Sequence, residues 1–151
     1  MGYAIFKLFH ILFTVIFLGN IIIAVFWKRH GDKTENPQII AHIMDGIIKA
    51  DRRFTVPGVA GLTICGFGAQ GMGGYPIMST WIFWSIILLI LSGIMYMAVV
   101  VPAQKKMLAI AQAPDFNKEE YERLSKKWEL WGSLATITPI IAVVLMVVKP
   151  Y

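Results

Sequence analysis

Four long apolar stretches alternate with charged connections along this chain. The apolar stretches cover residues of about 3–27, 54–72, 77–101 and 128–148. Each is close to the ~20 residues that a helix needs to cross the hydrocarbon core of a bilayer. The pattern therefore predicts an all-α chain, an integral membrane antiparallel four-helix bundle that forms one transmembrane domain over residues 1–151.

The connection between the first two apolar stretches has its own helical periodicity. From residue 37 to residue 51, apolar side chains gather on one face, those of Ile39, Ile40, Ile43, Met44, Ile47 and Ile48. His42, Asp45 and Lys49 share the opposite face. This spacing is typical of an amphipathic helix. We expect it either to lie on the membrane surface or to extend the second span.

The distribution of positive charge predicts the orientation in the membrane. Of the 14 Lys and Arg residues, 12 lie in the connections that follow the first and third apolar stretches, and only Lys7 and Lys149 lie elsewhere. Basic residues next to spans mark the cytoplasmic face. We therefore expect a multi-pass membrane protein with both termini outside. The first stretch is too long for a cleaved signal peptide, so we expect it to be retained.

Composition agrees with a membrane protein and excludes several other classes. The chain is 57% hydrophobic and has a mean hydropathy of +0.65, so the lipid bilayer is its expected surrounding. The net charge of +5 is explained by membrane topology, and we expect no nucleic acid partner. The single cysteine, Cys65, excludes an internal disulfide and a Cys-x-x-Cys motif. No catalytic triad, phosphate-binding loop or zinc spacing is present.

His10, inside the first apolar stretch, is the main candidate for function. Histidines within spans face a bundle interior, a cavity or a ligand, because an imidazole in hydrocarbon is costly. Lys7 and Thr14 share its helix face. Three aromatic rings lie on the same side, those of Phe6, Phe13 and Phe17. We expect His10 either to ligate a metal or to form a hydrogen bond between packed helices.

Two further features could belong to a site around His10. The second apolar stretch carries several glycines, among them Gly61, which let a neighbouring helix or a flat cofactor approach closely. Close helix packing is the favoured interpretation. Asp51, Arg52 and Arg53 form the densest charge cluster at a membrane boundary. Topology control explains this cluster, and the alternative is that Arg52 or Arg53 pairs with a propionate or another anionic substrate.

Several segments of the chain resemble known membrane proteins, among them residues 6–13, 51–58 and 145–150. Together with the aromatic and glycine-bearing stretches, they look like a bacterial family of predicted integral membrane proteins of unknown function, over nearly the whole chain. More distantly, the chain is similar to the superfamily that holds the HemJ-type protoporphyrinogen oxidases and the CopD-type copper-resistance proteins. In the HemJ-type proteins the first-helix histidine is implicated in binding b-type haem. The resemblance implies this role for His10, but their arginine and tryptophan motif is not reproduced at residues 19–27.

The residues and the resemblance together predict a haem b protein that acts in electron transfer or porphyrin-related oxidation. His10 would be the metal ligand, and the remaining cofactor-binding residues would be Thr14, Phe13, Gly61 and Arg52. The alternative is a non-catalytic membrane subunit, or a small-solute or copper transport component, with His10 as a polar contact between helices. Whether the chain is an enzyme stays open.

The second axial ligand is not evident from the sequence. The iron could be five-coordinate, or its second ligand could be a methionine such as Met72, Met78 or Met146. A residue of a second subunit is a further alternative, so a homo-oligomer or a membrane redox partner would fit. His42 is expected on the solvated face of its helix and His30 at the headgroups.

Overall fold

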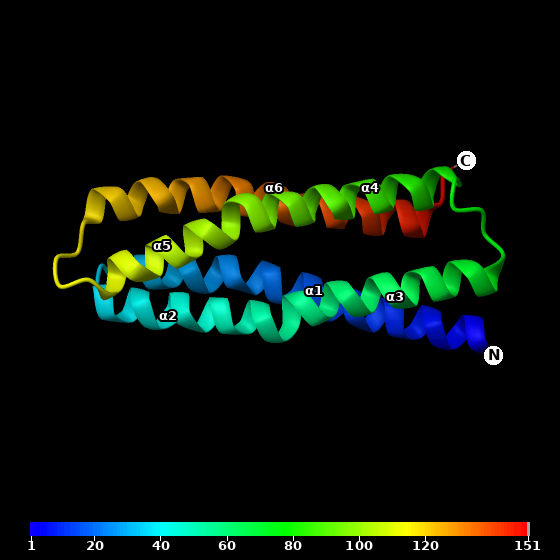
Figure 1. The fold of residues 1–151 in the computed structure, drawn as a ribbon, viewed down its shortest axis with the longest axis horizontal. Helices are drawn as coiled ribbons and strands as arrows, with labels where there is room; N and C mark the ends of the chain where they lie inside the picture. The colour runs from blue at the N-terminus through cyan, green and yellow to red at the C-terminus, as the bar shows by residue number, and fades with distance from the viewer. Residues whose placement is uncertain (151) are drawn as a thin grey trace.

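The computed structural model describes residues 1–150, and all regular structure within them is helical. The elements are α1 (Gly2–Asp32), α2 (Pro37–Ala50), η1 (Asp51–Thr55), α3 (Val56–Gly73), α4 (Thr80–Met95), η2 (Tyr96–Val100), α5 (Val101–Gln112) and α6 (Lys118–Val148). The elements η1 and η2 are π-helical turns. The predicted all-α class is confirmed (Figure 1).

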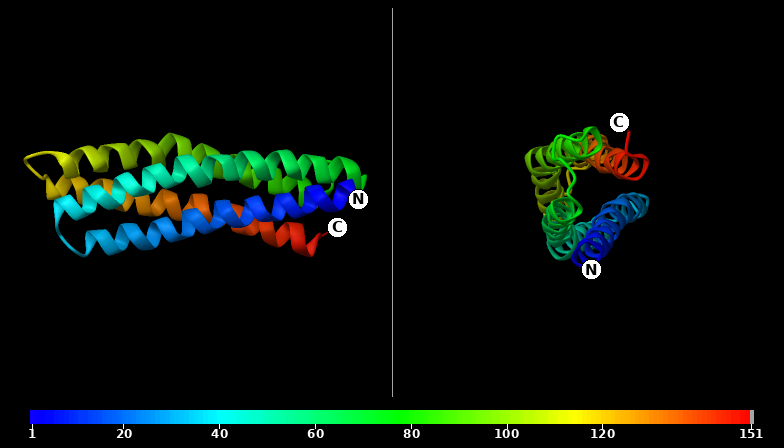
Figure 2. Two further views of the ribbon diagram at one scale, coloured as in Figure 1. Left: turned by 90° about the horizontal axis from the view of Figure 1, so that it is seen from below. Right: turned by 90° about the vertical axis from the view of Figure 1, so that its right-hand side faces the viewer.

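These elements form four long rods. α2, η1 and α3 follow one another without a break, as do α4, η2 and α5. Residues 37–51 therefore extend the second rod and are not a separate surface helix. At a rise of 1.5 Å per residue the rods are about 45 to 55 Å long, more than the ~30 Å hydrocarbon core of a bilayer. Both termini lie at the same end of the molecule (Figures 1 and 2).

Each π-helical turn is followed by a valine and a proline, Val56–Pro57 after η1 and Val101–Pro102 after η2. Proline has no N–H, and its ring collides with the carbonyl group four residues earlier. In both rods the amide before the proline instead bonds five residues back, to Asp51 and to Tyr96. The wider turn thus accommodates the proline within a continuous rod.

The rods pack as two pairs. In the half of the molecule that holds the termini, α1 runs along α3 and α4 runs along α6, whereas α3 and α4 do not pack on each other. In the other half, α2 packs on α5 and joins the pairs (Figure 1). The main cluster of buried apolar side chains lies there and in the middle, and includes Ile40, Met44, Ile47, Val100, Met107 and Tyr121.

The α1–α3 pair is held by close contacts of α1 with glycines of α3. From the terminus inward, the rings of Phe6, His10 and Phe13 lie on Gly68, Gly66 and Gly61. Farther inward, Gly58 lies against the backbone and Cβ atom of Phe17. A Cβ atom at Gly61 or Gly68 would lie 2.5 Å from a ring carbon, and one at Gly66 would lie 2.9 Å from the imidazole. These glycines serve close helix packing, the interpretation that the sequence favoured.

Three of the rods are long and apolar enough to cross a membrane, Gly2–Asp32, Thr80–Gln112 and Lys118–Val148. The predicted span at residues 54–72 is not among them, because the six glycines of α3 lower its hydropathy. Large apolar side chains are exposed on the outside of the bundle, such as Ile64 at 68% and Val147 at 76%. Exposure of this kind suits contact with lipid.

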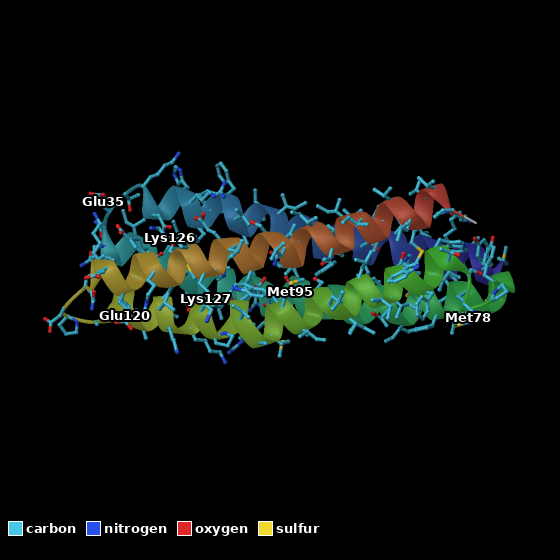
Figure 3. The ribbon with its side chains drawn as sticks, turned by 90° about the horizontal axis from the view of Figure 1, so that it is seen from above. Glu35, Met78, Met95, Glu120, Lys126 and Lys127 are labelled. Atoms are coloured by element: carbon cyan, nitrogen blue, oxygen red, sulfur yellow. The ribbon has the colours of Figure 1, made fainter. Side chains whose placement is uncertain are left out.

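The two ends of the bundle differ in chemistry. Glu35, Glu120, Lys126 and Lys127 lie toward the end away from the termini, and Met78 lies at the other end (Figure 3). At the end with the termini, the Lys149 ammonium lies 5.1 Å from the centre of the Tyr75 ring and 5.0 Å from that of Trp81. Aromatic and lysine side chains of this kind are typical of a membrane interface.

The contact between Gly61 and Phe13 gives a test of the α1–α3 packing. Gly61→Ala places a methyl group against the Phe13 ring, so we expect a loss of about 1–3 kcal/mol in the free energy of unfolding. The matched control is Gly71→Ala, where a Cβ atom meets nothing within 4 Å and where alanine favours the helix. Unfolding in mixed detergent micelles measures both. Equal stabilities of the two variants would contradict this packing.

Candidate functional site

His10 points from α1 toward α3. Its Nδ1 atom lies 2.6 Å from the backbone carbonyl oxygen of Leu62. Because a carbonyl oxygen only accepts, the neutral ring carries its proton on Nδ1 and keeps a lone pair on Nε2. The ring reaches this carbonyl across Gly66, which has no side chain to block it. A metal-ligating histidine has the same arrangement, with its second ring nitrogen bonded to a backbone carbonyl group.

The structure places two of the other predicted site residues as packing partners. The Phe13 ring covers Gly61, so these two residues contact each other and do not line open space. The Thr14 hydroxyl donates to the backbone carbonyl oxygen of His10 at 2.7 Å. It does not reach the imidazole, whose orientation is set instead by the Leu62 carbonyl group.

Arg52 lies apart from these residues. It is exposed in η1, ten residues before Leu62 on the same rod. That interval corresponds to about 15 Å of helix. The structure therefore brings His10, Thr14, Phe13 and Gly61 together and leaves Arg52 outside the group.

The other histidines do not add to the site. His42 is exposed, as expected. The His30 ring stacks on Phe26, with centroids 6.0 Å apart. Among residues 1–150 no three or more His, Cys, Asp or Glu side chains come together in a way that could hold a metal ion.

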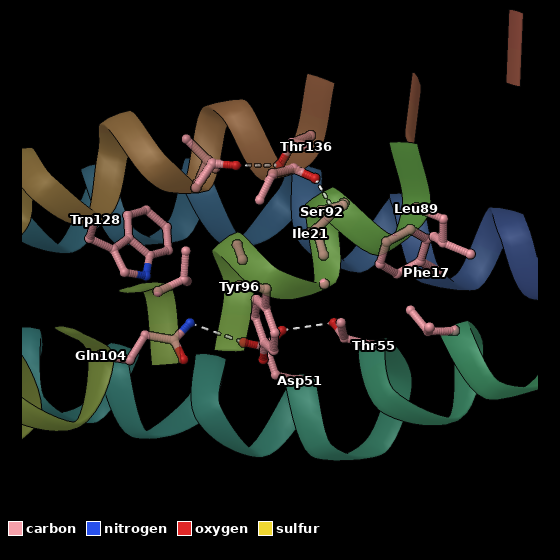
Figure 4. A pocket seen from close by; sticks show the side chains of 17 residues that line it. Phe17, Ile21, Asp51, Thr55, Leu89, Ser92, Tyr96, Gln104, Trp128 and Thr136 are labelled. Carbon is pink, nitrogen blue, oxygen red and sulfur yellow. Dashed lines mark hydrogen bonds between the residues drawn. The ribbon is translucent and has the colours of Figure 1, made fainter. Parts of the chain in front are cut away.

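A second polar group lies in the middle of the bundle, around Asp51. Asp51 is only 4% exposed, and three neutral side chains donate to its carboxylate. Asn20 Nδ2 and Thr55 Oγ1 bond to Oδ1 at 3.0 and 2.8 Å, and Gln104 Nε2 bonds to Oδ2 at 3.0 Å. The Tyr96 ring stands beside them (Figure 4). These bonds tie α1, η1 and α5 together, so Asp51 joins the two pairs of rods.

A pocket of about 70 Å³ lies beside Asp51, between the two pairs (Figure 4). Its polar lining consists of Asp51, Thr55, Ser92, Tyr96, Gln104 and Thr136. Trp128 also lines the pocket and is only 3% exposed. Its Nε1 atom is buried without a hydrogen-bond partner in the described chain. A buried N–H group without a partner is costly in free energy.

A third polar group surrounds Lys28, which is 1% exposed. Its ammonium donates to the Ser125 hydroxyl and lies 2.6 Å from Asp32 Oδ2 and 3.3 Å from Glu129 Oε1. The Tyr121 hydroxyl donates to Asp32 Oδ1 at 2.6 Å. Burial, reinforced by this bond, raises the pKa of Tyr121, which lies outside the predicted span at 128–148. Lys28 and its carboxylates form a buried ion cluster that joins α1 to α6.

Sequence reasoning missed most of the residues around Asp51. From the sequence, Asp51 was considered only as part of the charge cluster at a membrane boundary. No role was assigned to Thr55, Tyr96 or Gln104. One usable signal was Asn20, the most polar residue between Thr14 and Trp27. Its partners could not be found by periodicity, because η1 and η2 each shift the helical phase of the residues that follow.

Comparison with known protein families supports membrane integration. A family model described as "Predicted integral membrane protein (DUF2269)" matches residues 4–150. The chain belongs to this family. The expected membership of a family of predicted integral membrane proteins is thereby confirmed. No curated protein and no solved structure matches the DUF2269 chain, so the comparisons give no similarity to the HemJ-type or CopD-type proteins.

The ion cluster around Lys28 predicts the effect of one substitution. Lys28→Ala removes the charged donor to Ser125, Asp32 and Glu129, but it leaves two carboxylates that are partly exposed to solvent. We therefore expect a loss of about 1.5–3 kcal/mol in the free energy of unfolding. The control is Lys49→Ala, which removes an exposed pair with Asp45 and should cost about 0–1 kcal/mol. Unfolding in mixed micelles compares them. A loss as small as that of the control would show that the cluster is not stabilising.

Proposed function

We propose that this DUF2269 protein is a four-span protein of the bacterial inner membrane, an antiparallel bundle with both termini outside. The position of both termini at one end of the bundle supports this orientation. So does the gathering of 12 of the 14 Lys and Arg residues in the two connections. The fourth span is α3, which packs along α1 and is uncharged from Val56 to Gly73.

A reporter fused after Tyr151 tests the orientation. We expect a reporter that is active only outside the cytoplasm to work there, because Lys149 is the one basic residue near that end of the chain. The same reporter inserted at Asp115, in the connection between α5 and α6, should be inactive. The reverse pattern would overturn the proposed topology.

We further propose that His10 binds haem b through Nε2, in electron transfer or porphyrin-related oxidation. The observation that carries this proposal is the hydrogen bond from His10 Nδ1 to the Leu62 carbonyl oxygen. This bond leaves the lone pair of Nε2 free to bind iron. The haem iron would supply one-electron redox chemistry. The chain would supply the ligand and its fixed tautomer. Phe13 and Gly61 would support the ring through α1–α3 packing, and Arg52 is too distant to assist.

A second candidate function is that of a small-solute transport component or a non-catalytic membrane subunit. The observation that favours it is the pocket beside Asp51, which has polar lining from both pairs of rods. In that case His10 is a polar contact that fastens α1 to α3. The two candidates differ in whether His10 or Asp51 carries the function, so variants at these positions separate them.

An absorption spectrum of the full chain, purified in mild detergent and supplemented with haem, tests the first candidate. We expect a Soret band that His10→Ala abolishes or shifts, because the variant loses the proposed axial ligand. The control is His42→Ala, which changes an exposed histidine and should leave the spectrum unchanged. Absence of a Soret band in the unaltered protein, or an unchanged spectrum in His10→Ala, would overturn the proposal.

A further inference from the structure

The Asp51 carboxylate is buried without a cation. No Lys, Arg or His nitrogen of the described chain lies within 4.0 Å of it. Its neighbours Arg52 and Arg53 are exposed, as is Lys105 on α5. A carboxylate that is buried in a helix bundle without a counter-ion is costly, which makes Asp51 a candidate functional residue.

The partners of Asp51 suit both of its protonation states. Asn20, Thr55 and Gln104 donate to the carboxylate in the structure. Each of them can also accept, since an amide can turn its oxygen toward a protonated acid and a hydroxyl group can rotate. The Tyr96 hydroxyl, the titratable group that adjoins Asp51, has the same capacity. When Asp51 takes up a proton, its new O–H group therefore has an acceptor among these neighbours.

The cluster around Lys28 makes a useful contrast. There an ammonium group meets two carboxylates, Asp32 at 2.6 Å and Glu129 at 3.3 Å. The opposite charges of this cluster compensate each other, whereas Asp51 has no cation beside it. Trp128 separates the two groups, since the Lys28 ammonium lies 5.6 Å from the centre of its ring. The pocket and Asp51 lie on the other side of Trp128 from Lys28, and the partners of Asp51 are neutral.

The pocket has room and partners for water. A volume of about 70 Å³ exceeds the roughly 10–15 Å³ that a cavity needs to hold one water molecule. Ser92 and Thr136 line it and donate to backbone carbonyl groups, so their oxygen atoms stay free to accept. Water in the pocket would thus lie beside Asp51 (Figure 4).

From these observations we infer that the pocket is a hydrated proton-binding site and that Asp51 is the residue that takes up and releases the proton. The proton comes from bulk water and returns to it. Uptake breaks an O–H bond of hydronium and forms the O–H bond of the Asp51 acid, and release reverses these two changes. This inference does not depend on haem at His10, because the two sites share no residue.

Infrared difference spectroscopy of the full chain in lipid vesicles, recorded between alkaline and acidic pH, tests the assignment. We expect acidification to produce the C=O band of a buried carboxylic acid in the unaltered protein. Asp51→Asn should lose this band. The control Asp45→Asn, which changes a partly exposed carboxylate paired with Lys49, should keep it. A band that survives in Asp51→Asn, or no such band in the unaltered protein, overturns the inference.

Two additional measurements keep the test decisive if Asp51→Asn folds poorly. Gln104→Leu removes a donor to the carboxylate, so the C=O band should appear with a midpoint at higher pH. Gln112→Leu, at the exposed end of α5, should leave it unchanged. Sodium ions at constant pH should not remove the band. An unmoved midpoint in Gln104→Leu, or a response to sodium in place of pH, would show that Asp51 is not a proton site.

Discussion

The close approach of α1 to α3 is the contact on which the rest of the molecule depends. Lipid chains are as apolar as the side chains they surround, so helices in a bilayer associate through close packing and polar contacts and not through the hydrophobic effect. Here three rings of α1 lie on glycines of α3, and a fourth glycine, Gly58, lies against the backbone and Cβ atom of Phe17. The same approach brings His10 to the Leu62 carbonyl group and Asn20 to Asp51. Both candidate sites therefore rest on glycine packing.

The two halves of the bundle are stabilised in different ways. In the half away from the termini, buried aliphatic side chains such as Met44 and Met107 pack around the joined pairs, and the Lys28 cluster adds ionic contacts. In the half with the termini the pairs separate, and α3 does not pack on α4. Asp51 lies where one arrangement gives way to the other. A polar site at this position has four packed rods on one side and two separate, apolar pairs of rods on the other.

Much of the fold could be predicted from hydropathy and charge, because both depend on local sequence. The four helical stretches and the charged connections follow from runs of apolar and basic residues. The glycines also indicated close packing. The partners of Lys28 could not be predicted, since Ser125 and Glu129 lie about a hundred residues away in the chain. It also could not be predicted that the Asp51 side chain is buried and the Arg52 side chain exposed, because two adjacent charged residues give no sign of which one is buried.

The π-helical turn η1 has a consequence for the length of the chain. An α-helix turns by about 100° per residue, and η1 contains one residue more than a regular α-helical turn would need. Loss of a single residue there would rotate all of α3 relative to α2, so that the glycines would no longer lie against α1. The number of residues between Asp51 and Gly58 is therefore as strict a requirement as the identity of any side chain. A related chain with an alignment gap in this short interval would be unable to build the α1–α3 pair.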